Sequence, residues 1–539
     1  MIQKKSPDDP PGVGEPSEAG ATSRRTMLKR AGAAAAGVGV AAAVGGPLMA
    51  SLSRSDPARS AVMPTAEALR IDHVTVVDPR DGSSRPGMSV LVRDGRIASV
   101  TASAEADTTT GVQVIDGDGR FAVPGYNNMH THVLQEERRS RLFMAAMLAE
   151  GTTGMRQMAG SEDLLRHRRE RRLPLGVDTP GLHAMPGALL MPFNAPSVSR
   201  ARDEISRQKE LGADFIKLVQ VEREVFFDSV GWAHANGLRV AGHLPPSVNP
   251  LEASEAGFDC FEHLGTNTNI WIETSSDRGA LRGRENTSGA VPNWLGYVPF
   301  SQRIFSSGIV SKATAKSLLN PALMNSEETV AILRSALDSF DEGAATLLAE
   351  TFARNTTWQT PTLVRLRTQY LADAPEYEDH PWLEMVSAEA RGAFQESRRK
   401  FVDLPAETRS TYHRYYETTL KMIKMMHDAG VPLMTGTDGP SAVPGQDLHA
   451  EFREMAAAGL KPLDVLRSTT TTPASFLGRS DRMGAVAAGM DADFLLLDAD
   501  PLKSVDNLAK ISAVVRTGHL ATRQDILANV DRLLSAAEG

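Results

Sequence analysis

The chain has 539 residues, of which 41% are hydrophobic and 23% are charged, and its formal net charge is −8. This composition is globular, and the length suffices for one large domain and a smaller one. The single cysteine, Cys260, excludes an internal disulfide framework and any metal site built from several cysteines. The acidic balance gives no basic footprint for nucleic acid. We therefore expect a small-molecule or peptide substrate, and any metal must bind through His, Asp, Glu or Lys.

The first 50 residues have the organisation of an export signal. A polar start leads to paired arginines, Arg24 and Arg25, and then to an Ala/Gly/Val run over residues 31–46. The paired arginines resemble the twin-arginine export signal of bacteria, and the run is shorter than the ~20 apolar residues of a membrane span. We expect residues 1–50 to be a signal peptide and leader that the twin-arginine export machinery reads. The protein would then be periplasmic or extracellular; an uncleaved tail or anchor is the alternative.

Short alternating segments separated by Gly-Asp turns occupy residues 66–124, with strands expected at 70–77, 89–92, 96–100 and 112–116. Strand patterns return after residue 478, at 485–486, 493–497 and 511–516. We expect residues 66–124 and 478–521 to fold together into one small β-sandwich domain. A helix is expected over the remaining residues, 522–539.

Residues 125–477 alternate strand-like apolar runs with helical patterns, which is typical of parallel βα units. Strands are expected at 153–158, 215–220, 238–242, 260–263, 360–364 and 431–437, and helices at 138–150, 199–211, 224–235 and 410–429. The predicted fold class is α/β, with a (β/α)8 TIM barrel beside the β-sandwich. The irregular stretch 266–358 is expected to be an insertion that forms a lid over the barrel end where the βα loops gather. The Met-rich stretch 422–426 is expected to lie in the core.

Candidate metal ligands stand at the ends of the predicted barrel strands. His130 and His132 lie two residues apart, so both can point to the same face of the first strand. This pair alone is also compatible with two ordinary polar histidines. Four further candidates end later strands in chain order: Lys217, His243, His263 and Asp438. The ordered set, rather than any one motif, indicates a metal centre.

With residues 481–494 as a closing strand motif, this set resembles the metal-dependent amidohydrolase superfamily, in its imidazolonepropionase-like and prolidase-like branch. The resemblance covers essentially the whole mature chain. It departs from the family pattern at Asn128, where an aspartate often precedes the His-x-His pair, and at Gln157. These departures put neighbouring contacts in question rather than the ligands.

The resemblance implies two divalent metal ions, expected to be zinc. His130 and His132 would bind the more buried ion, and His243 and His263 the more exposed one. Lys217, carboxylated by carbon dioxide to a carbamate, would bridge the two ions. Asp438 would contact the buried ion and the attacking hydroxide. An unmodified Lys217, with a mononuclear site, is the alternative.

The implied reaction is hydrolysis of C–N amide bonds in dipeptides, N-acyl amino acids or cyclic amides. A hydroxide bridging the ions would attack the carbonyl, and Asp438 would act as proton shuttle, first general base and then general acid. Two alternatives remain: a mononuclear deaminase or lactone/ester hydrolase on the same scaffold, and a non-catalytic exported binding protein. The sequence leaves the exact substrate and homo-oligomerisation open.

Two more residues are candidates for substrate binding. His183 lies in an expected third strand and could face the substrate; a hydrogen-bonded core histidine is the alternative. Arg156 ends the second strand and could hold a substrate carboxylate with its bidentate fork. A structural ion pair is the alternative for Arg156.

Overall fold

A computed structural model of the chain describes residues 68–105, 111–135, 139–265, 268–284, 319–439 and 448–538. The predicted signal peptide, residues 1–50, lies outside these ranges. Within them, no helix combines the length and the apolar character that a membrane span requires.

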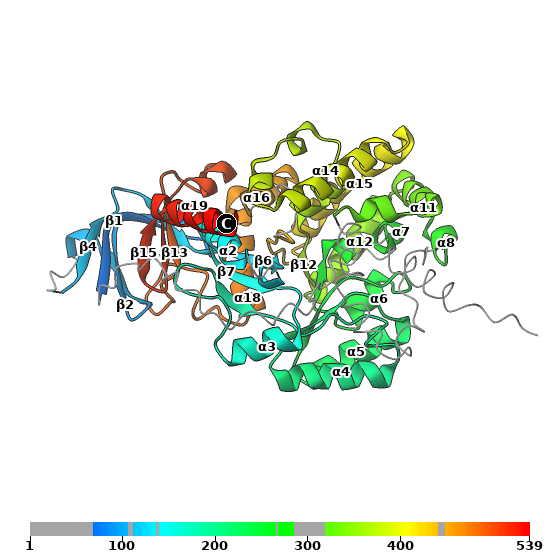
Figure 1. Cartoon of the computed structure of the whole chain (residues 1–539), viewed down its shortest axis with the longest axis horizontal. Coiled ribbons are helices and arrows are strands. Elements are labelled where there is room, and N and C mark those ends of the chain that lie inside the picture. Colours follow the sequence, from blue (N-terminus) through cyan, green and yellow to red (C-terminus); the bar gives the residue numbers. More distant parts are fainter. Residues whose placement is uncertain are drawn as a thin grey trace, which may run out of the picture.

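Strands from both ends of the described chain share one eight-stranded sheet, in the order β15-β14-β13-β5-β1-β2-β3 with β4 paired to β1 (Figure 1). The N-terminal strands are β1 (Ala68–Asp78), β2 (Ser83–Arg93), β3 (Arg96–Ala102), β4 (Gln113–Asp116) and β5 (Phe121–Pro124). The C-terminal strands are β13 (Phe494–Leu497), β14 (Ile511–Arg516) and β15 (His519–Thr522). The two groups meet where β13 pairs antiparallel with β5.

This sheet is one hydrogen-bonded unit, whereas the sequence predicted a sandwich. β1 pairs with β4 over Leu69–Asp72 and with β5 at Thr75 and Val76. Between these stretches the register of β1 against β2 shifts, and His73 has a φ of 55°. Such a bulge bends a strand, so residues of both halves of the sheet share one buried cluster. The predicted strand at 485–486 does not form; Ala485 and Val486 belong to this cluster as irregular chain.

The large part of the molecule contains two parallel sheets. One consists of β6 (Tyr126–Thr131), β7 (Thr152–Gln157) and β8 (Gly181–Ala184). The other consists of β9 (Phe215–Leu218), β10 (Arg239–Gly242), β11 (Cys260–Glu262) and β12 (Trp358–Thr360). Single parallel bridges join Leu190 to Leu218, Gln359 to Leu433, and Thr131 to Gly439. The predicted strand at 431–437 is therefore present as an extended segment with single bridges rather than as a continuous strand.

Helices surround these sheets (Figure 1). In chain order they are α2 (Ser140–Ala149), α3 (Glu162–Arg169), α4 (Val198–Leu211), α5 (Arg223–Ala235), α6 (Pro250–Glu255), α7 (Asn269–Glu273), α8 (Arg278–Leu281), α11 (Glu327–Asp338), α12 (Glu342–Arg354), α13 (Leu363–Tyr370), α14 (Ala388–Val402), α15 (Ala406–Asp428), α16 (Leu448–Ala457), α17 (Pro462–Thr469), α18 (Thr471–Phe476) and α19 (Arg523–Glu538). α4 shows why their limits were readable: the Ser197 side chain accepts from the backbone N–H of Arg200, and Gly212 ends the helix with a φ of 91°.

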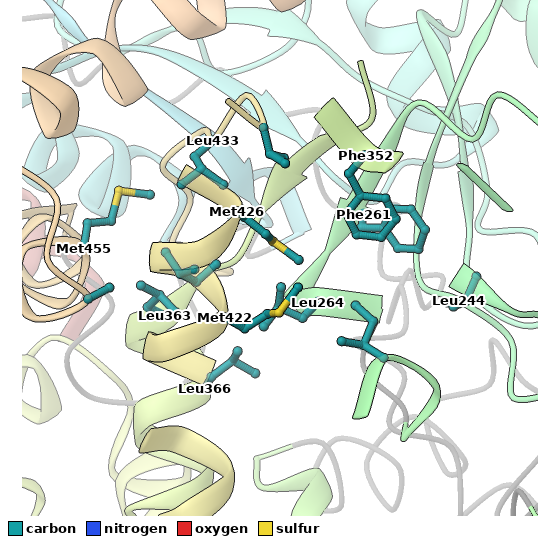
Figure 2. Close-up of a cluster of buried hydrophobic side chains, with 14 of the residues drawn as sticks. Leu244, Phe261, Leu264, Phe352, Leu363, Leu366, Met422, Met426, Leu433 and Met455 are labelled. Carbon is teal, nitrogen blue, oxygen red and sulfur yellow. The ribbon is translucent and has the colours of Figure 1, made fainter. Parts of the chain in front are cut away.

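The core packs between the sheets and the helices. Met422 and Met426, both fully buried on α15, lie with Leu433 and Leu264 in the cluster that Figure 2 shows. The prediction that the Met-rich stretch belongs to the core is confirmed for these two residues.

A separate small cluster joins the last helix to the first helix of the large part of the molecule. There α19 packs on α2 through Val530, Leu142 and Ala145.

One local prediction is wrong, and another is met only in part by the described residues. The strand expected at 360–364 ends at Thr360, because Thr362 has a left-handed φ of 48° and α13 begins at Leu363. The lid expected over residues 266–358 lies partly outside the described residues, at 266–267 and 285–318. Its helices α11 and α12 bury apolar faces in the main core cluster, for example Leu333 and Phe352. These two helices are therefore part of the packed α/β wall.

Candidate active site

The six predicted ligands lie at the carboxyl ends of the parallel strands. His130 is in β6 and Lys217 is in β9, while His132, His243 and His263 follow β6, β10 and β11 directly. Asp438 precedes Gly439, which bridges to Thr131 in β6. All six are buried, with exposures of 0% for His130, 8% for His132, 2% for Lys217, 4% for His243, 4% for His263 and 6% for Asp438.

Three of them place ligand atoms at metal-binding spacing. The Nε2 atoms of His130 and His132 are 3.3 Å apart. Oδ1 of Asp438 lies 3.1 Å from Nε2 of His130 and 2.9 Å from Nε2 of His132. Ligand atoms of a tetrahedral zinc ion, with bonds of ~2.0–2.1 Å, are separated by about 3.3 Å. This triangle therefore fits one face of a zinc coordination tetrahedron.

Lys217, His243 and His263 form the adjoining group. The His263 ring lies 4.6 Å from the His130 ring and 5.3 Å from the His243 ring. Nζ of Lys217 and Nε2 of His243 are both buried and have no hydrogen-bond partner among the described residues. Burying such atoms without a partner costs about 1–3 kcal/mol each. Nε2 of His243 is suited to bind a metal cation. Nζ of Lys217 is suited to carry an added carboxylate, as in a carbamate. The chain itself supplies neither group.

Burial sets the protonation of this group. It lowers the pKa of Lys217 to about 8, against the opposing charges of Glu262 and Asp438. About a tenth of the amine is then neutral at pH 7, and only a neutral amine can add carbon dioxide. Burial also lowers the pKa of His132, and it lowers the pKa values of His243 and His263 well below the ordinary range. Neutral imidazoles are the form that binds metals.

Asp438 is held as a carboxylate. Burial acts to raise its pKa, but the neighbouring His263, His130 and His132 outweigh burial and hold the pKa well below its usual range. On its other side, Oδ2 lies 3.4 Å from Nε of Arg365 and 3.9 Å from Nε2 of His263. The carboxylate thus stands between the histidine pair and a buried guanidinium.

Several residues at the site have a left-handed backbone conformation, which sets the direction of their side chains. His263, Leu264, Thr362 and Asp438 all have φ between 48° and 57°. Non-glycine residues cost free energy in this conformation and cluster at functional sites. Thr362 donates its hydroxyl to the carbonyl of Pro361 and accepts from Nδ1 of His263 at 2.5 Å. The ring of His263 therefore presents Nε2 to the site.

Arg156 and Glu262 lie immediately behind His130. All three side chains are fully buried. Nη2 of Arg156 is 2.7 Å from Oε1 of Glu262, and Nδ1 of His130 is 2.6 Å from Oε2 of the same carboxylate. Arg156, predicted to bind substrate or to form an ion pair, has the ion-pair geometry. Glu262 was not predicted from the sequence, although a charged residue inside the apolar strand before His263 was the available signal.

The second substrate-binding candidate, His183, contacts other residues. Its Nε2 lies 2.8 Å from Oδ1 of Asn127, and its Nδ1 lies 3.3 Å from Nη1 of Arg479. Burial, with the charge of Arg479, lowers its pKa to about 3. With both ring nitrogens engaged away from the six ligands, His183 has the geometry of a hydrogen-bonded structural histidine that is partly buried. Arg365 is instead the additional polar residue at the site, and its place in a helical pattern gave no signal.

The two departures from the family pattern have local roles. Oδ1 of Asn128 accepts from the backbone N–H groups of His130 and Thr437, and its Nδ2 donates to Oγ1 of Thr437. Asn128 therefore ties the strand of His130 to the segment of Asp438. Gln157 accepts from the backbone of Leu134 and donates to the carbonyl of Ala159, which fixes the loop after His132.

Residues 394–521 match the model of the Amidohydrolase family. This segment includes Asp438, β13 and β14. Over 68 residues, 13% of this chain, the sequence is 46% identical to an adenine deaminase of Paracoccus denitrificans, of which the match covers 11%. Over 211 residues, 35% of this chain, it is 32% identical to the imidazolonepropionase of Paracidovorax citrulli, of which the match covers 48%. The matches thus span less than half the length of these curated relatives.

A solved structure described as a candidate prolidase from Bifidobacterium longum superimposes with a TM-score of 0.54 at 19% identity, covering 88% of this chain and all of that one. The protein has this α/β fold. The resemblance expected from the sequence is therefore supported by the Amidohydrolase match over residues 394–521 and by the shared fold.

Proposed function

We propose that this protein is a metal-dependent hydrolase of C–N amide bonds, acting on a dipeptide, an N-acyl amino acid or a cyclic amide. The observation that carries the proposal is the triangle of ligand atoms from His130, His132 and Asp438. Beside it lie a buried lysine amine and a buried imidazole nitrogen that have no hydrogen-bond partner among the described residues. The family match and the relatives described as imidazolonepropionase and prolidase support the same reaction class.

We also infer that the two parallel sheets belong to one closed (β/α)8 barrel. Seven named strands and the extended segment before Gly439 provide eight parallel members. The bridges Leu190–Leu218, Gln359–Leu433 and Thr131–Gly439 link the ends of the two sheets in the order that closure needs. In such barrels the active site lies at the carboxyl ends of the strands, where the six candidate ligands are found.

The residues fit two divalent ions, which we propose to be zinc. His130, His132 and Asp438 would hold one, His243 and His263 the other, with the Lys217 carbamate between them. When bound, such ions lower the pKa of a coordinated water to about 7 and polarise a substrate carbonyl. Oδ2 of Asp438 would accept the proton of the attacking water and return it to the leaving nitrogen. Arg365, 3.4 Å from Oδ2, would keep that carboxylate in place.

Metal stoichiometry and a substrate panel test this function. Protein loaded with zinc and bicarbonate should hold close to two ions and turn over at least one dipeptide, N-acyl amino acid or cyclic amide. Lys217→Ala should lose one ion and the activity. A single bound ion in the wild type, with activity surviving in Lys217→Ala, would contradict the binuclear mechanism.

A deaminase is the second candidate, because the 46% identical segment belongs to an adenine deaminase. Including adenine and other aminated heterocycles in the same panel separates the two reactions. Release of ammonia from these compounds, without turnover of any amide, would favour the deaminase.

For localisation we propose twin-arginine export, supported by the paired arginines ahead of the apolar run. The full chain expressed in a bacterium should be found in the periplasm in processed form. A variant with Arg24→Lys and Arg25→Lys should stay in the cytoplasm with its leader. Equal export of both forms would contradict this route.

A further inference from the structure

A buried carboxylate stands behind one of the candidate metal ligands. Glu262 is the last residue of β11 and has no exposed surface. Its Oε2 is 2.6 Å from Nδ1 of His130, on the side of the ring away from His132 and Asp438. Its Oε1 accepts from Nη2 of Arg156 at 2.7 Å and lies 3.4 Å from Sγ of Cys260. Both carboxylate oxygens are therefore committed.

Arg156 fixes this carboxylate in turn. Its Nε donates to the carbonyl of Met129, the residue before His130, at 2.6 Å, and its Nη2 also reaches Oγ1 of Thr360 at 3.1 Å. The guanidinium thus connects β6, β7, β11 and β12 at one point. An unpaired carboxylate would be very costly in this dry position, and the arginine offsets that cost.

We propose that Glu262, held by Arg156, is a positioning residue that fixes the proton of His130 on Nδ1 and leaves Nε2 as the metal-binding atom. This role rests on the proposed metal-dependent function. A neutral imidazole carries one proton, and a carboxylate at 2.6 Å from Nδ1 can only accept it. The lone pair on Nε2 then faces the Nε2 of His132 and the Oδ1 of Asp438. A carboxylate acceptor also increases the basicity of the ligand nitrogen.

The neighbouring ligand provides an internal contrast. Nδ1 of His263 donates to the hydroxyl of Thr362, a neutral acceptor. Of these two histidines, His130 thus has a charged partner at Nδ1, whereas His263 has a neutral one. Removing the charge of Glu262 should weaken the ion held by His130 and leave the ion held by His263 and His243 largely unchanged.

Competitive zinc titration against a chromogenic chelator tests the role without relying on activity. Glu262→Gln keeps the size of the side chain and removes its charge. We expect it to weaken one of two zinc equivalents by about 10- to 100-fold, as for other partners of metal-bound histidines. Asp493→Asn is the matched control, because it breaks the ion pair of Asp493 with Arg516 in the β-sheet domain. It should lower thermal stability and leave both zinc affinities unchanged.

The single variant leaves the buried charge of Arg156 unpaired, which could impair folding. The double variant Glu262→Gln with Arg156→Met removes this charge and therefore controls for a folding defect. It should show the same selective loss of one zinc equivalent. If either folded variant binds both equivalents with wild-type affinity and loses only stability, the pair is a structural ion pair and the positioning role is overturned. A wild-type protein that binds no zinc would instead contradict the proposed function itself.

Discussion

Glu451 gives a sharp test of the electrostatics of this fold. It lies on α16 with no exposed surface, and its Oε2 accepts from the backbone N–H of Val364 at 2.8 Å, at the start of α13. Oε1 has no hydrogen-bond partner within the described part of the chain. Burial raises the pKa of Glu451 to about 8, even though the backbone N–H groups of Val364 and Leu363 act to lower it. The folded protein therefore prefers the neutral acid.

The sign and size of the effect follow from linkage. The folded pKa is above the ordinary value of 4.5, so the stability from Glu451 is fully present below pH 4.5 and is lost as the pH rises through about 8. Each pKa unit is worth about 1.4 kcal/mol, which gives a total loss of about 5 kcal/mol across this window. Glu451→Gln keeps an oxygen for the N–H groups of α13 and cannot ionise. The variant should therefore lose less stability than the wild type as the pH rises.

Urea unfolding in EDTA, followed by tryptophan fluorescence between pH 5 and pH 9, measures this difference without metal linkage. The free energy of unfolding of the wild type minus that of Glu451→Gln should fall by about 4 kcal/mol from pH 5 to pH 8 and then level off. All other titrating groups are common to both proteins and cancel. A difference that stays constant over this range would refute the reasoning.

Three further outcomes are expected. Asp438→Asn should lower kcat by about 10²- to 10⁴-fold with unchanged far-UV circular dichroism, because it removes the proton acceptor; near-normal turnover would rule Asp438 out of that role. Lys217→Ala should bind one zinc equivalent fewer by elemental analysis, and this deficit should not be repaired by bicarbonate. Phe352→Ala, in the fully buried core face of α12, should cost about 3–5 kcal/mol in urea unfolding, whereas a surface lid would tolerate the change.

Residue type and position made the candidate ligands predictable. His130, Lys217 and Asp438 stand where a parallel strand ends, and that edge of a sheet collects the side chains of successive strands. Glu262 and Arg365 were not predicted, because their roles depend on partners 132 and 73 positions away in the chain, His130 and Asp438. No spacing in the sequence encodes such contacts.

The errors in the fold have the same character. The bend of the β-sheet depends on a positive φ at His73. The residue type at this position does not predict that conformation. The polar stretch after α7 suggested that the whole range 266–358 lay outside the core. Yet α11 and α12 carry helical apolar faces, and packing against the sheets decides where such helices lie.

The charges around the site imply a preference among amide substrates. Glu262 pairs with Arg156 and Asp438 lies beside Arg365, so these four side chains nearly neutralise each other. In the proposed binuclear site, each divalent ion would add two positive charges, while a carbamate on Lys217 would return only one negative charge. Such a site would keep an excess of positive charge in a buried setting, where a substrate carboxylate is strongly favoured.

An N-acyl amino acid should therefore have a larger kcat/KM than its C-terminal amide. The expected ratio is at least 10-fold, and it should shrink as the ionic strength rises, since salt screens the attraction. Matched pairs of substrates that differ only in this carboxylate provide the measurement. Equal kcat/KM values within such pairs would show that the excess charge is balanced within the protein, and they would direct the search to neutral cyclic amides.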